Sequence, residues 1–359
     1  MAPIYLGSTE VSKVYKGSTE VSQAYLGTNA LLSTLDSTEH FGILTYSGDN
    51  SNPRNITGLG FDPDMVWVKN RHSGGENHGI GDVLRSSGKL LYPNLTLTEN
   101  TGEYITPITD GVKISTGNNN YSGNDYVAWA WKAGGSGTSN SDGTISSTVS
   151  ANTEAGFSIV TYTGNNASSA TVGHGLDSAP QLVIVKARNL SAGWPTLFND
   201  GTYTNKGIRL NESSVDTGNS TVFFNNTNPS STVFTVGSSD ETNDGYNYVA
   251  YCFHSVDGHQ KVGSYSGTGN SGLEVSLGFQ ARFIMVKKAA PSGDRWLMAD
   301  TTRHAALNND AFIDTTSALS EGDFNCTNGI TFGSNSFTVN TTDGSFNHSS
   351  GTYIYLAIA

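Results

Sequence analysis

Charged residues, cysteines and long apolar runs are all scarce in this chain of 359 residues. Only 14% of the residues are charged, and 31 acidic residues against 19 lysines and arginines give a formal net charge of -12 at pH 7. A negative field repels phosphate, so we expect no nucleic-acid partner. No apolar run approaches the roughly 20 residues that a membrane-spanning helix needs, so we expect no membrane insertion.

The two cysteines, Cys252 and Cys326, are too few and too far apart for a Cys-x-x-Cys redox or zinc site. Residues 1–5 lack the basic and apolar regions of a secretory signal, so the chain is expected to assemble in a cytoplasm. We therefore expect no disulfide between the two cysteines. Cys252 takes an alanine-like position in a repeated strand, which predicts a buried structural residue.

Glycine is abundant, with 42 residues, and serine, threonine and asparagine are also frequent. Glycine and asparagine supply the positive φ angles of tight turns, and threonine suits strands. No stretch keeps a 3.6-residue apolar period for three turns, which excludes a helical bundle. The composition predicts an all-β fold.

A ten-residue repeat opens the chain, with units that begin at Tyr5, Tyr15 and Tyr25. Each of the first two units continues with Gly-Ser-Thr-Glu-Val-Ser, which predicts small strands that fold back and forth. Such strands bury little apolar area alone, so we expect residues 1–37 to dock on another surface or chain. A frayed tail is the alternative.

A longer unit occurs three times, and the same four anchors recur in it in the same order. An aromatic strand ends in a glycine turn at residues 43–48, 159–164 and 262–267. A second glycine turn follows at 58–61, 173–176 and 276–279. An apolar strand then ends in Lys69, Lys186 or Lys287. An aromatic strand closes each copy at 126–131, 248–253 and 353–358.

The triplication predicts three tandem β-sandwich domains, of jelly-roll or lectin-like type, at residues 38–133, 152–255 and 256–359. Residues 134–151 are rich in glycine and serine, which predicts a flexible linker with a mobile joint near residue 137. Only a short connection separates the second and third copies, so we expect these two to pack closely.

Aligned positions in the closing strand indicate which way its side chains point. Val127, Trp129 and Trp131 and their counterparts are apolar in every copy and two residues apart, so they should line the core of each copy. The strands that end in lysine are unbroken apolar runs, as in central strands covered on both faces. Their lysines are expected to reach solvent or to pair with a loop carboxylate.

Candidate binding residues follow two of these strands, where Trp194 precedes Asp200 and Trp296 precedes Asp300. A flat ring stacks on sugar and a carboxylate accepts hydrogen bonds from hydroxyls, so these four residues are candidates for a glycan-facing edge. The alternative is that both tryptophans are core residues of the next strand. The first copy has His78-Gly-Ile-Gly-Asp82 at this place instead.

Metal and catalytic signals are weak. The acidic loop at residues 239–245 offers clustered oxygens that suit calcium, and ordinary turn composition explains it equally. No other cofactor or metal is expected, because His72 and His78 have no third ligand nearby. No catalytic motif is present, so we expect a non-enzymatic protein. Loop carboxylates such as Asp62 and Asp64 leave a carbohydrate-active enzyme as an alternative.

The anchors at residues 159–165, 172–176, 248–253 and 351–357, with the leading Tyr-Leu-Gly-Ser-Thr-Glu-Val units, resemble a repeated β-domain of tail-fibre-like virion proteins in marine tailed bacteriophages. The resemblance covers nearly the whole chain. It implies a virion location and a structural or host-attachment role, with no catalytic residues to carry over. The first copy departs from the pattern by lacking the tryptophan, and the N-terminal segment is short.

These observations favour a tail fibre or tail appendage subunit, assembled in the host cytoplasm. Residues 1–37 would dock on other virion proteins, and the sandwiches would face outward to a host-surface glycan or protein. Linked copies raise avidity without new contacts, and a homo-oligomer is expected. A capsid-decorating or head-fibre protein without a host ligand is the alternative.

Overall fold

The computed structural model describes residues 5–6, 9–10, 15–16, 19–20, 23–26, 29–33, 35–72, 76–85, 88–115, 117–202, 206–214, 220–304, 311–319, 321 and 329–359. Within residues 5–33 and at positions 206 and 220 only the backbone is described. The chain divides into two units, Met1–Asp36 and Ser37–Ala359, called here the N-terminal unit and the body. Each is described by itself.

The N-terminal unit contains three small antiparallel strand pairs, one in each repeat. The pairs are β1 (Tyr5–Leu6) with β2 (Thr9–Glu10), β3 (Tyr15–Lys16) with β4 (Thr19–Glu20), and β5 (Gln23–Leu26) with β6 (Asn29–Ser33). The prediction of short strands that fold back on each other is confirmed for these residues.

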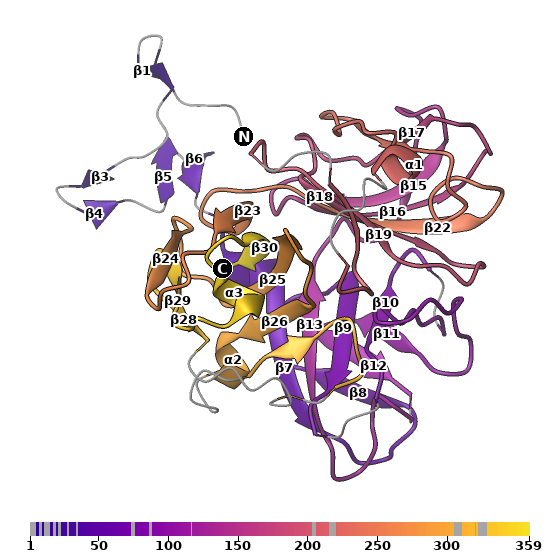
Figure 1. Cartoon of the computed structure of the whole chain (residues 1–359), viewed down its shortest axis with the longest axis horizontal. Helices are drawn as coiled ribbons and strands as arrows, with labels where there is room; N and C mark the ends of the chain where they lie inside the picture. Colours follow the sequence, from indigo (N-terminus) through magenta and orange to yellow (C-terminus); the bar gives the residue numbers. More distant parts are fainter. Residues whose placement is uncertain are drawn as a thin grey trace. The chain divides into compact units, whose positions relative to one another are not determined.

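The body is all-β, and each repeat copy contributes one large and one small sheet (Figure 1). In copy one the large sheet has the order β10 (Gly79–Asp82), β9 (Met65–Asn70), β13 (Asp125–Trp131), β7 (Phe41–Ser47). Its small sheet has the order β11 (Ile105–Ile108), β12 (Gly111–Ile114), β8 (Arg54–Thr57). The predicted all-β sandwich character is confirmed.

Copy two has the widest sheet, because two extra strands precede its opening strand. The order is β14 (Thr138–Asn140), β15 (Ser147–Asn152), β16 (Phe157–Thr163), β22 (Asn247–Phe253), β18 (Leu182–Ala187), β19 (Pro195–Phe198), β20 (Lys206–Arg209). The small sheet pairs β17 (Ala170–Gly173) with β21 (Val233–Val236).

In copy three, as in copy one, the opening strand lies at the edge of the large sheet. The large sheet has the order β23 (Gln260–Ser266), β30 (Thr352–Ile358), β25 (Phe283–Ala290), β26 (Trp296–Asp300), β27 (Ile313–Asp314). The small sheet has the order β24 (Leu273–Ser276), β29 (Ser336–Val339), β28 (Ile330–Phe332).

Helical segments in the described residues are short. They are η1 (Ser37–Glu39), α1 (Ser220–Phe224), α2 (Thr301–His304) and α3 (Gly344–Asn347). In the part of the chain that the structure describes, none of them has the length and apolar character to cross a bilayer.

The lysine-ended and closing strands lie inside their sheets, as their unbroken apolar sequences predict. In copy one, β9 pairs with β10 on one side and with β13 on the other, and every residue of β9 is buried. The closing strand β13 is buried from Tyr126 to Trp131. A strand with sheet neighbours on both edges and layers on both faces has no polar surface to present, which explains the lack of alternation.

The three copies share one apolar core, and each also has a core of its own. The shared cluster contains the side chains on one face of all three closing strands, including Trp129, Tyr251 and Leu356. The opposite faces of those strands pack on the small sheet of the same copy, where Ala128, Ala250 and Tyr355 lie in three separate clusters. Burial of the Trp129 face is thus confirmed, but this face joins copies instead of filling one sandwich.

The segment 134–151, expected as a flexible linker, is part of the sheet of copy two. Strand β15 pairs along six residues with β16, and β14 pairs with β15. The Gly134 amide donates to Ser150 Oγ at 2.9 Å, and a side chain on Gly134 would start 2.6 Å from the Ala151 carbonyl oxygen. Gly134 and Gly143 allow a close approach of another backbone. With β14 and β15 paired in the sheet, the expectation of a mobile joint is wrong.

The division into three domains stays a prediction, because residues 37–359 form one compact unit. Cys252 is buried and free, and burial raises the pKa of its thiol to about 12, as a structural cysteine requires. Cys326 lies outside the described residues, so the predicted absence of a disulfide between the two cysteines stays a prediction.

Candidate functional site

One aromatic ring in each copy reaches a backbone carbonyl of another copy. Trp296 of β26 is paired with Lys287 across the sheet, and its Nε1 donates to Arg209 O of copy two at 3.1 Å. Trp194, just before β19, donates from Nε1 to Leu95 O of copy one at 3.0 Å. His78, just before β10, has its Nε2 2.9 Å from Asp314 O of copy three.

These three contacts form a cycle. Copy three donates to copy two, copy two donates to copy one, and copy one contacts a carbonyl of copy three. The repeat therefore closes on itself as a ring of three copies around the shared core. His78 stands where the other copies have tryptophan, and its ring nitrogen makes the same kind of contact. The difference in sequence at His78 conserves the hydrogen bond while it changes the ring.

The lysines that end the central strands are buried at these same junctions. Lys69, Lys186 and Lys287 are all fully buried, and each ammonium donates to carbonyls of its own loop and of the adjoining copy. Burial lowers the pKa of Lys186 to about 8 and that of Lys287 to about 7. The expectation that these lysines reach solvent or a loop carboxylate is wrong, because the carbonyls at the junction satisfy them.

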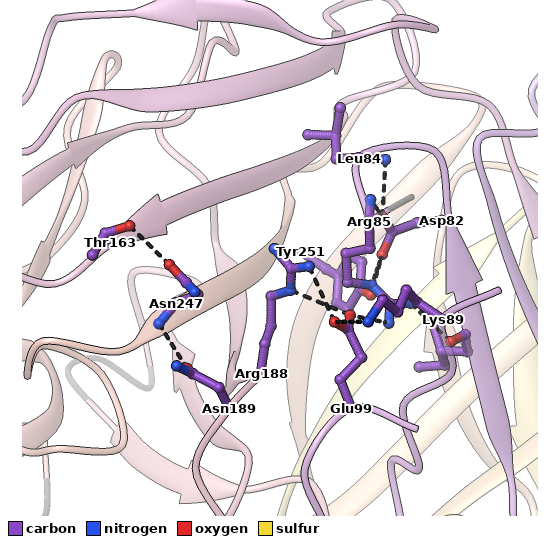
Figure 2. Close-up of polar contacts among 11 residues, drawn as sticks. Asp82, Leu84, Arg85, Lys89, Glu99, Thr163, Arg188, Asn189, Asn247 and Tyr251 are labelled. Atoms are coloured by element: carbon purple, nitrogen blue, oxygen red, sulfur yellow. Dashed lines mark hydrogen bonds and ion pairs between the residues drawn. The ribbon is translucent and has the colours of Figure 1, made fainter. Parts of the chain in front are cut away.

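Two junctions also contain a buried carboxylate and guanidinium three residues apart. Asp82 Oδ2 lies 2.6 Å from Arg85 Nε and accepts a hydrogen bond from the Tyr251 hydroxyl of copy two at 2.7 Å. Glu99 adds contacts to Arg85, Lys89 and Arg188 of copy two, as Figure 2 shows.

The corresponding pair in copy three is Asp300 and Arg303, also 2.6 Å apart and fully buried. Asp300 accepts from Trp129 Nε1 of copy one at 2.9 Å, and Glu321 contacts both Arg303 and Arg71 of copy one. A buried charge is tolerated only with full pairing, and each of these carboxylates has several donors. Both clusters hold copies together.

The third junction is apolar at the matching positions. Phe198 stands in copy two where the sheet register places Asp82 and Asp300 in the other copies. Leu356 of copy three stands where the other closing strands have Trp129 and Tyr251. Leucine has no hydrogen to donate and phenylalanine accepts none, so donor and acceptor are absent together and neither is left unpaired.

Three of the four predicted glycan-contact residues lie in the interior. Trp194, Trp296 and Asp300 are at most 1% exposed and take part in the junctions described above. Their rings and carboxylate therefore form no exposed edge for sugar stacking. Both tryptophans are core residues, as the alternative prediction stated. Asp200 is half-buried and lies elsewhere, because the strand position matching Asp300 is Phe198.

Sequence reasoning missed Arg85, Arg303, Glu99 and Glu321 as partners at the junctions. The Asp-x-x-Arg spacing at 82–85 and at 300–303 was a signal for two of them, because it recurs at the same place in copies one and three. The two glutamates lie in loops whose lengths differ between copies, so alignment gave no signal for them.

The loop at residues 239–245, a candidate for calcium, uses its polar groups internally. Glu241 pairs with Arg209 at 2.8 Å, and Asn243 accepts from the Asn165 amide at 2.9 Å. The Tyr248 hydroxyl donates to Asp240 O at 2.6 Å. Among the described residues no group of three His, Cys, Asp or Glu side chains is placed to hold a metal.

A groove of about 570 Å³ in the body involves one of the predicted residues, Asp200. It lies in copy three between β23 and β24, and Tyr355 and Asp200 line it. Burial and the nearby Asp200 carboxylate raise the pKa of the Tyr355 hydroxyl. The groove opens where β23 forms the edge of its sheet, whereas β16, the matching strand of copy two, is covered by β15.

A side-chain exchange across two strands shapes this groove. Leu44 faces Ala128 in copy one, and Val160 faces Ala250 in copy two. In copy three Gly263 faces Tyr355, so the large side chain has moved to the closing strand. The ring of Tyr355 covers Gly263, since a Cβ there would lie 2.5 Å from the Tyr355 hydroxyl oxygen. The opening strand thus contributes no side chain of its own at this position.

No curated protein and no solved structure matches the chain. A family model described as "Domain of unknown function (DUF7483)" matches residues 36–359, which is the body together with one residue before it. All three copies and their junctions lie inside that match. The chain belongs to the DUF7483 family.

Proposed function

We propose that this chain is a non-enzymatic structural subunit of a virion appendage, a phage tail fibre or tail appendage, that serves assembly and host-surface attachment. The observation that carries the proposal is that the chain consists of two separate units with different architectures. Three copies close on a shared core in the body, while the repeated strand pairs of residues 1–36 form a separate unit.

The polar chemistry at the repeated positions of the body supports this role. The buried lysines, the aspartates of the two Asp–Arg pairs and the ring nitrogens all make hydrogen bonds to another copy. Groups engaged in this way hold a shape and orient loops. A body of fixed shape with a separate repeat segment suits a subunit that docks through the repeat segment and presents the surface of the body.

The N-terminal unit is the proposed docking segment. Its two-residue strands bury little area by themselves and would gain stability on another surface. Other virion proteins are the proposed partners of this unit, and a host-surface glycan or protein is the proposed partner of the body. A homo-oligomer would multiply weak contacts to the host.

Deletion of residues 1–36 tests the docking role. We expect the shortened chain to fold with the unfolding temperature of the full chain, because the shared core lies in the body, and to be lost from particles. Quantitative immunoblotting of purified virions, with calorimetry of the free protein, measures both. Normal incorporation of the shortened chain would contradict the docking role.

Immunogold labelling of intact particles with antibody against residues 152–359 tests the location. We expect label on tails. Label confined to heads would favour a capsid-decorating protein instead, and hydrolysis of host-surface glycans by the purified chain would contradict the non-enzymatic role.

A further inference from the structure

Copy two shows what covers the place that is open in copy three. Strand β15 adds to the edge of β16, with Thr148 opposite Thr161 and Val149 opposite Val160. Val149 is buried in the core of copy two, and Ser147 Oγ donates to Gly173 O of the small sheet at 2.9 Å. One short strand therefore closes the gap between the large and the small sheet.

Copy three has no counterpart of β15 among the described residues. The backbone of Gln260 is paired with Val256, and Ser255 Oγ accepts from the Val262 amide at 3.0 Å. Beyond Val262 the outer edge of β23 stays open over residues 263–266, which line the groove together with β24. An open strand edge is a template for another strand.

The sequence of β15 indicates what fits this edge. Its first four residues, Ser147-Thr148-Val149-Ser150, are a hydroxyl residue, a polar residue, a valine and a serine in that order. The same order occurs in the N-terminal repeats as Thr-Glu-Val-Ser at residues 9–12 and again at 19–22. In copy two the valine is the residue that enters the core.

We propose that the Thr-Glu-Val-Ser stretch of a second copy of this chain adds to the open edge of β23 as a short antiparallel strand, its valine entering the groove. With the register of copy two, that valine lies opposite Gly263 and packs on the ring of Tyr355. Glu10 or Glu20 takes the place of Thr148, which is exposed in copy two. Chains are then linked head to tail, each giving a strand and receiving one.

This inference names a partner for the N-terminal unit and so rests in part on the proposed docking role. Two observations beyond that role support it. The strands β2 and β4 are only two residues long, so leaving them to pair elsewhere costs little. The groove also lies where the chain itself supplies a strand in copy two.

Sedimentation velocity of the full chain over a range of concentrations measures the effect. The wild type should associate, and the double variant Val11→Asp/Val21→Asp should associate at least about tenfold more weakly, because a buried unpaired carboxylate is costly. The matched control Val14→Asp/Ala24→Asp adds the same two charges three residues later in each repeat and should associate like the wild type.

A substitution in β23 tests the acceptor edge. The Val262 amide points away from β30, to Ser255 Oγ, so the amide of Ser264, two residues further on, points to the open side as well. Ser264→Pro therefore removes a donor from the open edge and leaves the hydrogen bonds to β30 in place. Calorimetry checks the folding, and sedimentation should show that association is lost. A monomeric wild type, unchanged association of the valine double variant or of Ser264→Pro, or equal loss in the control would overturn the inference. Normal particle incorporation of the acceptor variant would leave the proposed function intact even then.

Discussion

Two arginines, Arg85 and Arg303, place their charge in the interior of the body. Each is fully buried and is paired with an aspartate three residues earlier and with a loop glutamate. Removing one partner of a buried pair leaves the other charge unpaired, whereas replacing both by apolar groups is close to neutral. The third junction has the apolar solution, with Phe198 of copy two and Leu356 of copy three, so the same fold supports both solutions.

Arg303→Met should therefore lower the free energy of unfolding by about 3–5 kcal/mol, because Asp300 and Glu321 lose their buried partner. Arg295→Met removes the same kind of side chain from a more exposed ion pair with Asp314 and should cost less than about 1 kcal/mol. Urea unfolding of both variants measures the difference. Equal costs would mean that the buried pair has no special part at the junction.

At the scale of elements, the segment 134–151 shows that glycine has two different meanings. Glycines in a free linker give chain flexibility, but Gly134 lets the chain pass close to Ala151 of strand β15. Sequence composition is the same in both cases. The contacts of β14 and β15 decide between them.

Gly134→Ala should lower the free energy of unfolding by about 1–3 kcal/mol, because the new methyl group meets the backbone of Ala151 at 2.6–2.7 Å. Gly344→Ala is the matched control, since its Cβ would meet nothing within 4 Å and it begins the helix α3. The control should be neutral or slightly stabilising. Thermal unfolding measures both, and a neutral Gly134→Ala would restore the linker interpretation.

At the scale of the whole molecule, the shared core makes the three copies interdependent. Trp131, Phe253 and Ile358 occupy equivalent positions in the three closing strands, and all lie in the same apolar cluster. A cavity of about 20 Å³ lined by residues of all three copies lies in that cluster, so its packing is close to complete. Three independent domains joined by flexible linkers would each show an unfolding transition of their own.

Trp131→Ala should cost about 3–5 kcal/mol through lost burial and the cavity left behind. Because the cluster is shared, the loss should appear in a single unfolding transition of the body, and Phe253→Ala or Ile358→Ala should lower that same transition. Differential scanning calorimetry of the three variants decides the matter. Separate transitions, each shifted by one variant only, would establish three independent domains.

The all-β class, the triplication and the alternation of faces in the closing strands could be predicted without the structure. These are local properties, because turn residues, β-branched residues and a two-residue period act through the backbone of one segment. Aligning the three copies also predicted burial at Trp129, Trp131 and Cys252, which the structure confirms. The predicted function and its partners are not local in this sense and stay proposals.

Which surfaces the buried faces meet depends on how the three copies pack together. A strand sequence specifies that a face is apolar, but the same pattern serves a core within one copy or a core between copies. Trp194, Trp296 and Asp300 were predicted to be exposed but are buried for that reason. Their partners Leu95, Arg209 and Trp129 come from other copies. The open edge at Gly263 is decided in the same way, because covering it depends on a strand from elsewhere in the chain or from another chain.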